Sequence, residues 1–189
     1  MGAFTVMCDL SCQIHTPRKH SLADPHRDMN REEATKELWQ LCSGKWLGYR
    51  WNISGIEMKD EVCRLLKVDG IRVDVEEDGF RPLHCVCCDD DVCVTTLLLD
   101  AGADPNGITI DDGYTPLHWA CVFGHLKIVQ LLIRNGAMPS MDVKNIHGHT
   151  PLDIALQKNR REVATWLTSL MSLRLVITRW YAKRNERRF

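Results

Sequence analysis

The feature that most constrains this sequence is a segment that returns twice at a nearly constant interval. Its glycine and proline landmarks lie 34 and then 35 residues apart: Gly79, Gly113 and Gly148, and Pro82, Pro116 and Pro151. An interval in this range is the signature of stacked repeats, in which one unit cannot bury its apolar face alone and must pack on its neighbours. A histidine or cysteine inside the segment therefore has to be interpreted as part of a repeat before it is assigned to a site.

One unit, "DGYTPLHWACVFGHLKIVQLLIRNGA" from Asp112 to Ala137, shows what the repeat builds. Thr115 is a natural N-cap, and Pro116 suits the first turn of a helix, where an N–H would have no partner in any case. The apolar residues that follow share one helical face: Leu117, Ala120 and Cys121. Gly136 ends a second apolar helix as a C-cap that can take a positive φ. Each unit is thus predicted to form a turn, a short helix, a tight link, a second helix and an extended loop.

Two motifs in a fixed order identify the repeat. T-P-L-H-x-A is complete at Thr115–Ala120 and partial at Arg81–Val86 and Thr150–Ala155, and G-H-x-x-I-V-x-L-L follows at Gly124–Leu132. In these residues the chain resembles the ankyrin repeat. The resemblance implies an all-α solenoid of stacked helix-turn-helix units with projecting β-turn loops.

The rest of the sequence is divided around these three units. A degenerate unit precedes them, with helices at Glu32–Cys42 and within Asp60–Val75, and with a loop, Ser43–Lys59, that covers the open end of the stack. In the last unit Asn159 stands in for a turn glycine, and apolar residues then predict an extended C-terminal capping helix: Val163, Trp166, Leu167, Leu170 and Leu173. We therefore expect a mobile N-terminal segment (1–30), an ankyrin repeat domain (31–171, with a first unit 31–75, a second 76–109, a third 110–144 and a fourth 145–171) and a basic C-terminal helix or tail (172–189).

The stretch "HCVCCDDDVC" contains the atoms of a zinc site: His84, Cys85, Cys87, Cys88 and Cys93. Aligned on the third unit, Cys85 and Cys87 take the places of Trp119 and Cys121, inside the stack, and helical geometry turns Cys88 away from Cys85. Buried free cysteine behaves as a small hydrophobe. We therefore predict structural thiols and no metal ligands here. A zinc-binding or enzymatic protein that uses this cluster is the alternative.

The histidine of the motif, His118, is the other candidate for chemistry. The resemblance to ankyrin repeats implies that a histidine here bridges backbone groups of neighbouring units, and Asp153 replaces it in the last unit. A catalytic base or metal ligand would need a second polar group beside it, and the sequence holds no G-x-x-x-x-G-K, G-x-S-x-G or H-E-x-x-H motif. We predict no enzyme activity, no catalytic residue, no cofactor and no small-molecule substrate.

Charge is distributed unevenly along the chain. Residues 74–112 hold eleven acidic side chains and one basic side chain, whereas residues 174–189 hold six basic and one acidic. Opposite signs suggest partners or an internal contact, and the alternative is that both regions are solvated surface. The tail could fold back on the acidic loops, act as a nuclear import signal through "KRNERR", or lie on an anionic membrane with Trp180, Tyr181 and Phe189 at the interface. We favour a capping helix with a basic exposed end.

The resemblance also implies function as a non-catalytic protein–protein interaction module or adaptor, because ankyrin loops and first helices form a concave face that recognises proteins. Carried onto this sequence, the partner-binding residues are Phe80, Asp89, Asp111, Asp112, Tyr114, Val122, Phe123, His147 and His149, with Cys88, Gln157 and Lys158 as further exposed positions. Aromatic side chains dominate many interfaces, and acidic loops attract basic segments. We predict a basic or mixed peptide segment as the ligand. Substrate recognition for a ubiquitin ligase is an alternative.

Three further expectations concern modification, location and assembly. Asn106 follows Leu98 by eight residues, and the resemblance implies that such a loop asparagine is a substrate of an intracellular asparaginyl hydroxylase. Nine cysteines without a secretion signal favour the cytoplasm, the nucleus or both. No run of residues is apolar enough for a membrane span, the acidic loops would repel nucleic acid, and we expect a monomer.

Overall fold

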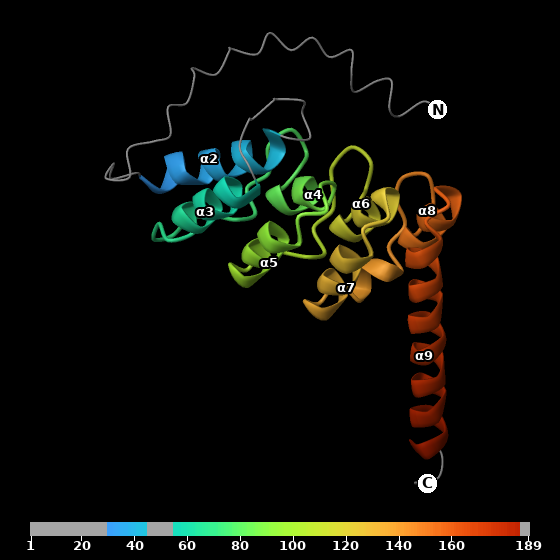
Figure 1. The fold of residues 1–189 in the computed structure, drawn as a ribbon. Helices are drawn as coiled ribbons and strands as arrows, with labels where there is room; N and C mark the ends of the chain where they lie inside the picture. Colours follow the sequence, from blue (N-terminus) through green and yellow to red (C-terminus); the bar gives the residue numbers. More distant parts are fainter. Residues whose placement is uncertain (1–29, 45–54, 186–189) are drawn as a thin grey trace.

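The computed structural model describes residues 30–44 and 55–185 (Figure 1). Its elements follow in chain order: α2 (Arg31–Gly44), α3 (Gly55–Leu65), α4 (Pro82–Val86), α5 (Val92–Asp100), α6 (Pro116–Phe123), α7 (Leu126–Arg134), the 3₁₀-helix η1 (Pro139–Met141), α8 (Pro151–Gln157) and α9 (Arg161–Asn185). The helices pair as α2 with α3, α4 with α5, α6 with α7 and α8 with α9, and the pairs stack in a row. Within the described residues there is no β-strand, only an isolated bridge between Glu77 and Phe80. The predicted all-α solenoid of stacked helix pairs is confirmed.

The turns of the units form as the sequence predicts. Thr115 and Thr150 precede α6 and α8, and the side-chain oxygen of each accepts the backbone N–H three residues later, at 3.4 Å and 3.3 Å. Gly124 ends α6 with a φ of 84°, and Asn159 follows α8 with a φ of 57°. Asparagine enters this left-handed region more readily than most side chains, because its short amide can hydrogen-bond locally. Asn159 therefore does replace the turn glycine, as predicted.

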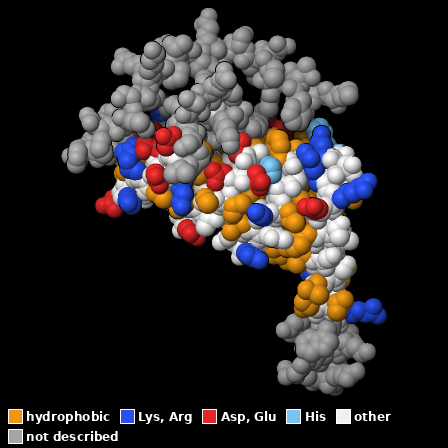
Figure 2. Space-filling model, in the orientation of Figure 1, with side chains coloured by type: hydrophobic (Ala, Val, Ile, Leu, Met, Phe, Trp, Pro, Cys, Tyr) orange, Lys and Arg blue, Asp and Glu red, His pale blue; other side chains and the backbone are white. Residues whose placement is uncertain are grey.

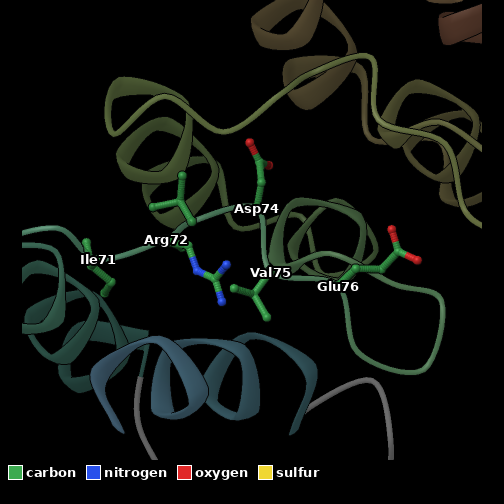
Figure 3. A pocket seen from close by; sticks show the side chains of 6 residues that line it. Ile71, Arg72, Asp74, Val75 and Glu76 are labelled. Carbon is green, nitrogen blue, oxygen red and sulfur yellow. The ribbon is translucent and has the colours of Figure 1, made fainter. Parts of the chain in front are cut away.

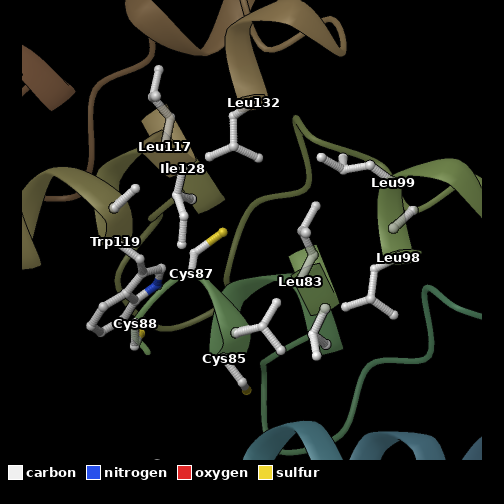
Figure 4. Close-up of a cluster of buried hydrophobic side chains, with 14 of the residues drawn as sticks. Leu83, Cys85, Cys87, Cys88, Leu98, Leu99, Leu117, Trp119, Ile128 and Leu132 are labelled. Carbon is white, nitrogen blue, oxygen red and sulfur yellow. The ribbon is translucent and has the colours of Figure 1, made fainter. Parts of the chain in front are cut away.

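A continuous apolar core joins the helix pairs. One cluster of buried side chains extends from Ala34 in α2 to Leu167 in α9. Figure 4 shows its middle, where leucines of the second unit lie close to apolar side chains of the third: Leu83, Leu98 and Leu99, and Leu117, Ile128 and Leu132. Full burial of one such side chain is worth about 1.5–3 kcal/mol. The interface between units is therefore itself a stabilising part of the fold.

The first unit differs from the prediction in its second helix. α3 begins at Gly55, earlier than the expected start at Asp60, because Met58 is buried on the same helical face as Val62 and Leu65. The predicted covering loop, 43–59, is correspondingly shorter, and its residues 45–54 lie outside the described residues. The same holds for residues 1–29 of the expected mobile segment.

Helix α9 begins in the stack and then leaves it. Val163, Ala164 and Leu167 are buried against the last unit, which confirms the predicted capping helix. Leu173, expected on the same apolar side, is 59% exposed, because α9 has by then passed beyond the other helices (Figure 1). Among the described helices, none is both long enough and apolar enough to cross a bilayer.

Candidate protein-binding surface

Two buried histidines connect neighbouring units. The Nδ1 atom of His118 accepts the N–H of Thr115 at 3.0 Å, and its Nε2 lies 3.3 Å from the carbonyl oxygen of His149 in the fourth unit. His84 repeats the arrangement, with the N–H of Arg81 at 3.1 Å and a carbonyl oxygen of the following loop at 3.0 Å. Because Nδ1 accepts a hydrogen bond, the proton of the neutral ring lies on Nε2, which donates to the neighbour. The bridging role predicted for His118 is confirmed.

Burial also fixes the charge state of these rings. Loss of hydration lowers the pKa of His84 and of His118 to about 4, and the hydrogen bonds to backbone carbonyls oppose this only in part. Both rings are therefore neutral near pH 7, and both are enclosed by the stack. Asp153 occupies the same position in the fourth unit, where it accepts the Thr150 N–H at 2.9 Å and the Thr150 hydroxyl at 2.7 Å. These hydrogen bonds lower the pKa of its carboxyl group.

The cysteine cluster lies inside the stack. Cys85, Cys87 and Cys88 are buried, and Figure 4 shows their side chains diverging, with Cys85 toward α2 and Cys87 toward Ile128. Burial raises the pKa of Cys85 to about 12 and raises those of Cys87 and Cys88 further, so all three are neutral thiols. The expected exposure of Cys88 is wrong, because its sulfur turns inward and lies 3.3 Å from the carbonyl oxygen of His84. Within residues 30–44 and 55–185, no three His, Cys, Asp or Glu side chains are grouped so as to hold a metal ion.

A surface hollow of about 540 Å³ is lined by six consecutive residues, 71–76, of the loop after α3 (Figure 3). Its two carboxylates take part in contacts between loops. Asp74 accepts the N–H of Asp104 at 3.1 Å, and Glu76 lies 3.7 Å from the guanidinium of Arg81. The lining contains no hydroxyl, thiol or imidazole, and it includes none of the predicted partner-binding residues.

The predicted partner-binding residues differ in their exposure. Asp111 and His147 are exposed, as are Gln157 and Lys158. Partly buried are Asp89, Asp112, Tyr114, Phe123 and His149. Phe80 and Val122 are only 6% and 7% exposed, so their assignment to an open face is wrong.

Phe80 and Val122 are buried by residues of adjacent units. The Phe80 ring lies 6.0 Å from the ring of Trp119, in the contact between the second and third units. The Phe80 carbonyl accepts the indole N–H of Trp39 at 3.1 Å. Val122 lies on α6 beside the start of α9, where Nε of Arg160 donates to the Val122 carbonyl at 2.9 Å. Side chains from adjacent units thus remove both residues from the surface.

The rings of Tyr114 and Phe123 both lie close to the ring of the buried Trp119. The ring centroids are 5.0 Å apart for Tyr114 and Trp119 and 6.5 Å apart for Phe123 and Trp119. Phe123 also stacks on His125, with ring planes 8° apart. Burial raises the pKa of Tyr114, and a hydrogen bond with Asn145 acts against this shift. Partly exposed rings held in this way keep their orientation, which suits them to act as anchors for a partner.

The loops expose isoleucines that the sequence patterns do not predict. Ile108, Ile110 and Ile146 are 49%, 72% and 64% exposed. The Ile146 N–H donates to the Asp112 carbonyl at 3.1 Å, which joins the loops before α6 and before α8. We call the surface they share the loop ridge: Ile108, Ile110, Asp111, Asp112, Ile146 and His147. The one signal in the sequence is "NGITIDDG", where isoleucines occur between turn residues and outside any helical pattern.

The loop ridge is acidic. Arg81, the basic side chain within residues 74–112, is already engaged by Asp104 at 3.4 Å and by Glu76 at 3.7 Å. No basic side chain of the described residues lies within ion-pair distance of Asp111 or Asp112. The ridge therefore places carboxylates with no described counter-ion next to exposed apolar side chains.

Asn106 fastens two neighbouring loops. Its Nδ2 donates to the carbonyl of Gly136 at 3.1 Å, and its Oδ1 accepts the hydroxyl of Ser140 at 2.7 Å. These bonds would have to open before an enzyme could reach the side chain. Hydroxylation of Asn106 stays a prediction from the resemblance.

Comparison with known proteins agrees with this architecture. Residues 83–174 match the family model of ankyrin repeats in three copies, whereas a search of curated proteins found no match. The matched residues extend from α4 into α9 and include both bridging histidines and the loop ridge. Ankyrin repeats are typically non-enzymatic modules of protein–protein interaction, so membership implies protein partners. This chain is an ankyrin repeat protein.

Proposed function

We propose that this protein is a non-catalytic adaptor that binds a segment of a partner protein along the loop ridge, and that this segment carries both apolar and basic side chains. The observation that carries the proposal is the placement of exposed isoleucines beside carboxylates that have no described counter-ion. The isoleucines would bind apolar side chains of a ligand and the carboxylates would bind basic ones. A peptide that carries both kinds of side chain fits the whole ridge.

The apolar part of the ridge spans two loops. Ile110 precedes α6 and Ile146 precedes α8, and the hydrogen bond from Ile146 to Asp112 keeps the loops together. A ligand that lies across the loops can cover both isoleucines at once. Apolar area removed from water contributes about 25 cal/mol per Å², so these are the side chains on the ridge from which a partner gains most.

The acidic part sets the sign of the ligand's charge. Asp111 is exposed and Asp112 partly so, and carboxylates at the edge of a binding surface accelerate the approach of a basic segment. The association should therefore weaken as salt is added, because exposed charges are screened. The same charges support a protein ligand over a nucleic acid, whose phosphates they would repel.

Peptides selected from a random display library on the full chain would test this function. We expect the selected peptides to be rich in lysine or arginine together with apolar residues. The dissociation constant of the tightest peptide should rise about tenfold for each of Ile110→Ser and Ile146→Ser, the loss typical of a substantial interface side chain. Asp60→Asn, an exposed change on α3 far from the ridge, is the matched control and should leave the constant unchanged.

The outcome that contradicts the proposal is equally specific. Acidic peptides, or basic peptides that bind the Ile110→Ser/Ile146→Ser double variant as tightly as the original chain, would remove the loop ridge as the binding surface. Tyr114→Ala and Phe123→Ala extend the test to the neighbouring rings. Unchanged affinity in both would limit the surface to the loops.

We further propose that the protein works in the cytoplasm, the nucleus or both. The described cysteines are free, and five of the seven are buried as thiols, which supports a reducing compartment. Imaging of the full chain with a small tag would test this, and a secreted product would contradict it.

A further inference from the structure

The part of α9 beyond the stack has an uncovered apolar surface. Partial burial ends at Met171, and every side chain from Ser172 to Arg179 is exposed. Leu173, Leu175, Val176 and Ile177 are among them, with exposures between 48% and 70%. Residues 172–185 extend the helix by roughly 21 Å at 1.5 Å per residue. In Figure 2 apolar side chains and a basic side chain are visible on this projecting part.

These apolar side chains do not form a ring around the helix. At about 100° per residue, Leu173, Val176 and Ile177 fall within an arc of about 100°, and Leu175 lies almost opposite. Arg174 and Arg179 each lie about 110° from the middle of the arc, one on either side. The projecting helix thus has an apolar face flanked by two guanidinium groups, which is the pattern of a helix that lies at a membrane surface.

Its charge calls for an anionic surface. Residues 174–189 contain six basic residues and one acidic residue. Arg174 pairs with Asp142 at 2.7 Å, which fixes the helix to the stack at its base. No acidic side chain of the described residues lies within ion-pair distance of Arg179.

The acidic loops of the same chain do not supply that surface. In Figure 1 the loops before α6 and α8 lie at the upper edge of the stack, and α9 extends downward, away from them. Side-by-side pairing of two copies of α9 would bury the apolar arc but would also bring the arginines of both copies together, which is unfavourable. An anionic lipid surface accommodates both features, since acyl chains can take the apolar arc and headgroups the guanidinium groups.

We propose that the projecting part of α9 lies on an anionic membrane surface, with Leu173, Val176 and Ile177 inserted among the lipids and Arg179 at the level of the headgroups. The helix rests on the bilayer and does not cross it. The inference is independent of the loop ridge, which stays free to bind its partner. The protein would thereby hold that partner close to the membrane.

Co-sedimentation of the full chain with vesicles tests this proposal. We expect binding to vesicles that contain phosphatidylserine and little binding to vesicles of phosphatidylcholine alone. Leu173→Ser/Ile177→Ser should reduce the partition coefficient at least about tenfold, since each change removes several buried carbon atoms. Arg179→Gln should reduce it about fivefold, the effect of one basic residue near an anionic surface.

Leu175→Ser is the matched control, because it removes a leucine of similar exposure from the opposite side of the same helix and should leave binding unchanged. All of these side chains are exposed, so each variant should unfold at the same temperature as the original chain. Absence of binding to the anionic vesicles, or equal losses in Leu175→Ser and Leu173→Ser/Ile177→Ser, would overturn the proposal. Self-association in sedimentation velocity that the same double variant abolishes would also overturn it, because a second copy would then cover the apolar arc.

Discussion

The third and fourth units use different residues at one position of the same turn, and the difference shows what that position does. In the third unit His118 accepts a hydrogen bond from its own turn at Nδ1 and reaches the next unit with Nε2, 3.3 Å from the His149 carbonyl. In the fourth unit Asp153 accepts the N–H and the hydroxyl of Thr150, and within the described residues its side chain makes no hydrogen bond to another unit. No further unit of the described chain follows it.

Capping of the unit's own turn is therefore kept in both units. The contact to a following unit is lost in the fourth, where the described chain has no following unit. Both side chains cap the first turn of a helix, α6 or α8. Only the imidazole has a second polar atom far enough from the first to span two units. The histidine of the motif is thus explained by contact between repeats.

Mild acid should produce the largest effect on stability, and it should act through the interior histidines. Folding depresses the pKa of His84 and His118 from 6.5 to about 4, so their contribution is complete above pH 6.5 and is lost as the pH falls toward 4. Between pH 7 and pH 5 this amounts to about 2 kcal/mol for each histidine, or about 4 kcal/mol together. Urea denaturation across this range measures it. His118→Gln should remove about half of the pH dependence, and an unchanged slope would contradict the assignment.

Truncation at the two equivalent positions should give unequal losses. His118→Ala leaves the buried Thr115 N–H without a partner, removes one of the two hydrogen bonds to the His149 carbonyl and creates a cavity, which should cost about 3 kcal/mol. Asp153→Ala removes only a partly exposed cap and should cost about 1 kcal/mol. Chemical denaturation of the two variants at pH 7 gives the comparison directly. Equal losses would mean that the contact between units contributes little.

The turn after each first helix should show a smaller contrast. Gly124→Ala places a Cβ at positive φ and 2.7 Å from Cδ of Arg160, and a loss of about 1–2 kcal/mol is expected. Asn159 already carries a Cβ at the equivalent positive-φ position, so Asn159→Ala should lower the free energy of unfolding by less than about 1 kcal/mol. Thermal unfolding of both variants tests the order. A larger loss at Asn159 would contradict it.

The smallest contrast concerns the outer side of the last unit. Cys121 is fully buried in α6, whereas Leu156, at the equivalent place in α8, is 61% exposed because no unit covers it. Cys121→Ser buries a hydroxyl and should cost about 1–2 kcal/mol, while Leu156→Ser should change stability by less than about 0.5 kcal/mol. If Leu156→Ser were as damaging as Cys121→Ser, another part of the chain would have to cover α8.

The repeat architecture could be predicted from the sequence because its determinants are local. Thr115, Pro116 and Gly124 each specify a backbone state through their own chemistry, and Thr150, Pro151 and Asn159 take the same places 35 residues later. The inward position of Cys85 and Cys87 followed from the same alignment. Where local rules suffice, the prediction and the structure agree.

The candidate site was harder to predict, because exposure depends on distant residues. Phe80 and Val122 are covered by Trp39, Trp119 and Arg160, which belong to other units. The exposed Ile110 and Ile146 are apolar and would ordinarily be assigned to a core. Only the packing of whole units shows which side chains remain at the surface.

Hydrogen–deuterium exchange on the full chain, with and without the tightest display-selected peptide, tests the central claim most directly. If the loop ridge is the binding surface, the bound peptide should slow exchange at residues 104–113 and 143–149 and leave the outer helices α5 and α7 unchanged. Protection confined to α5 and α7, with the loops unaffected, would contradict the account.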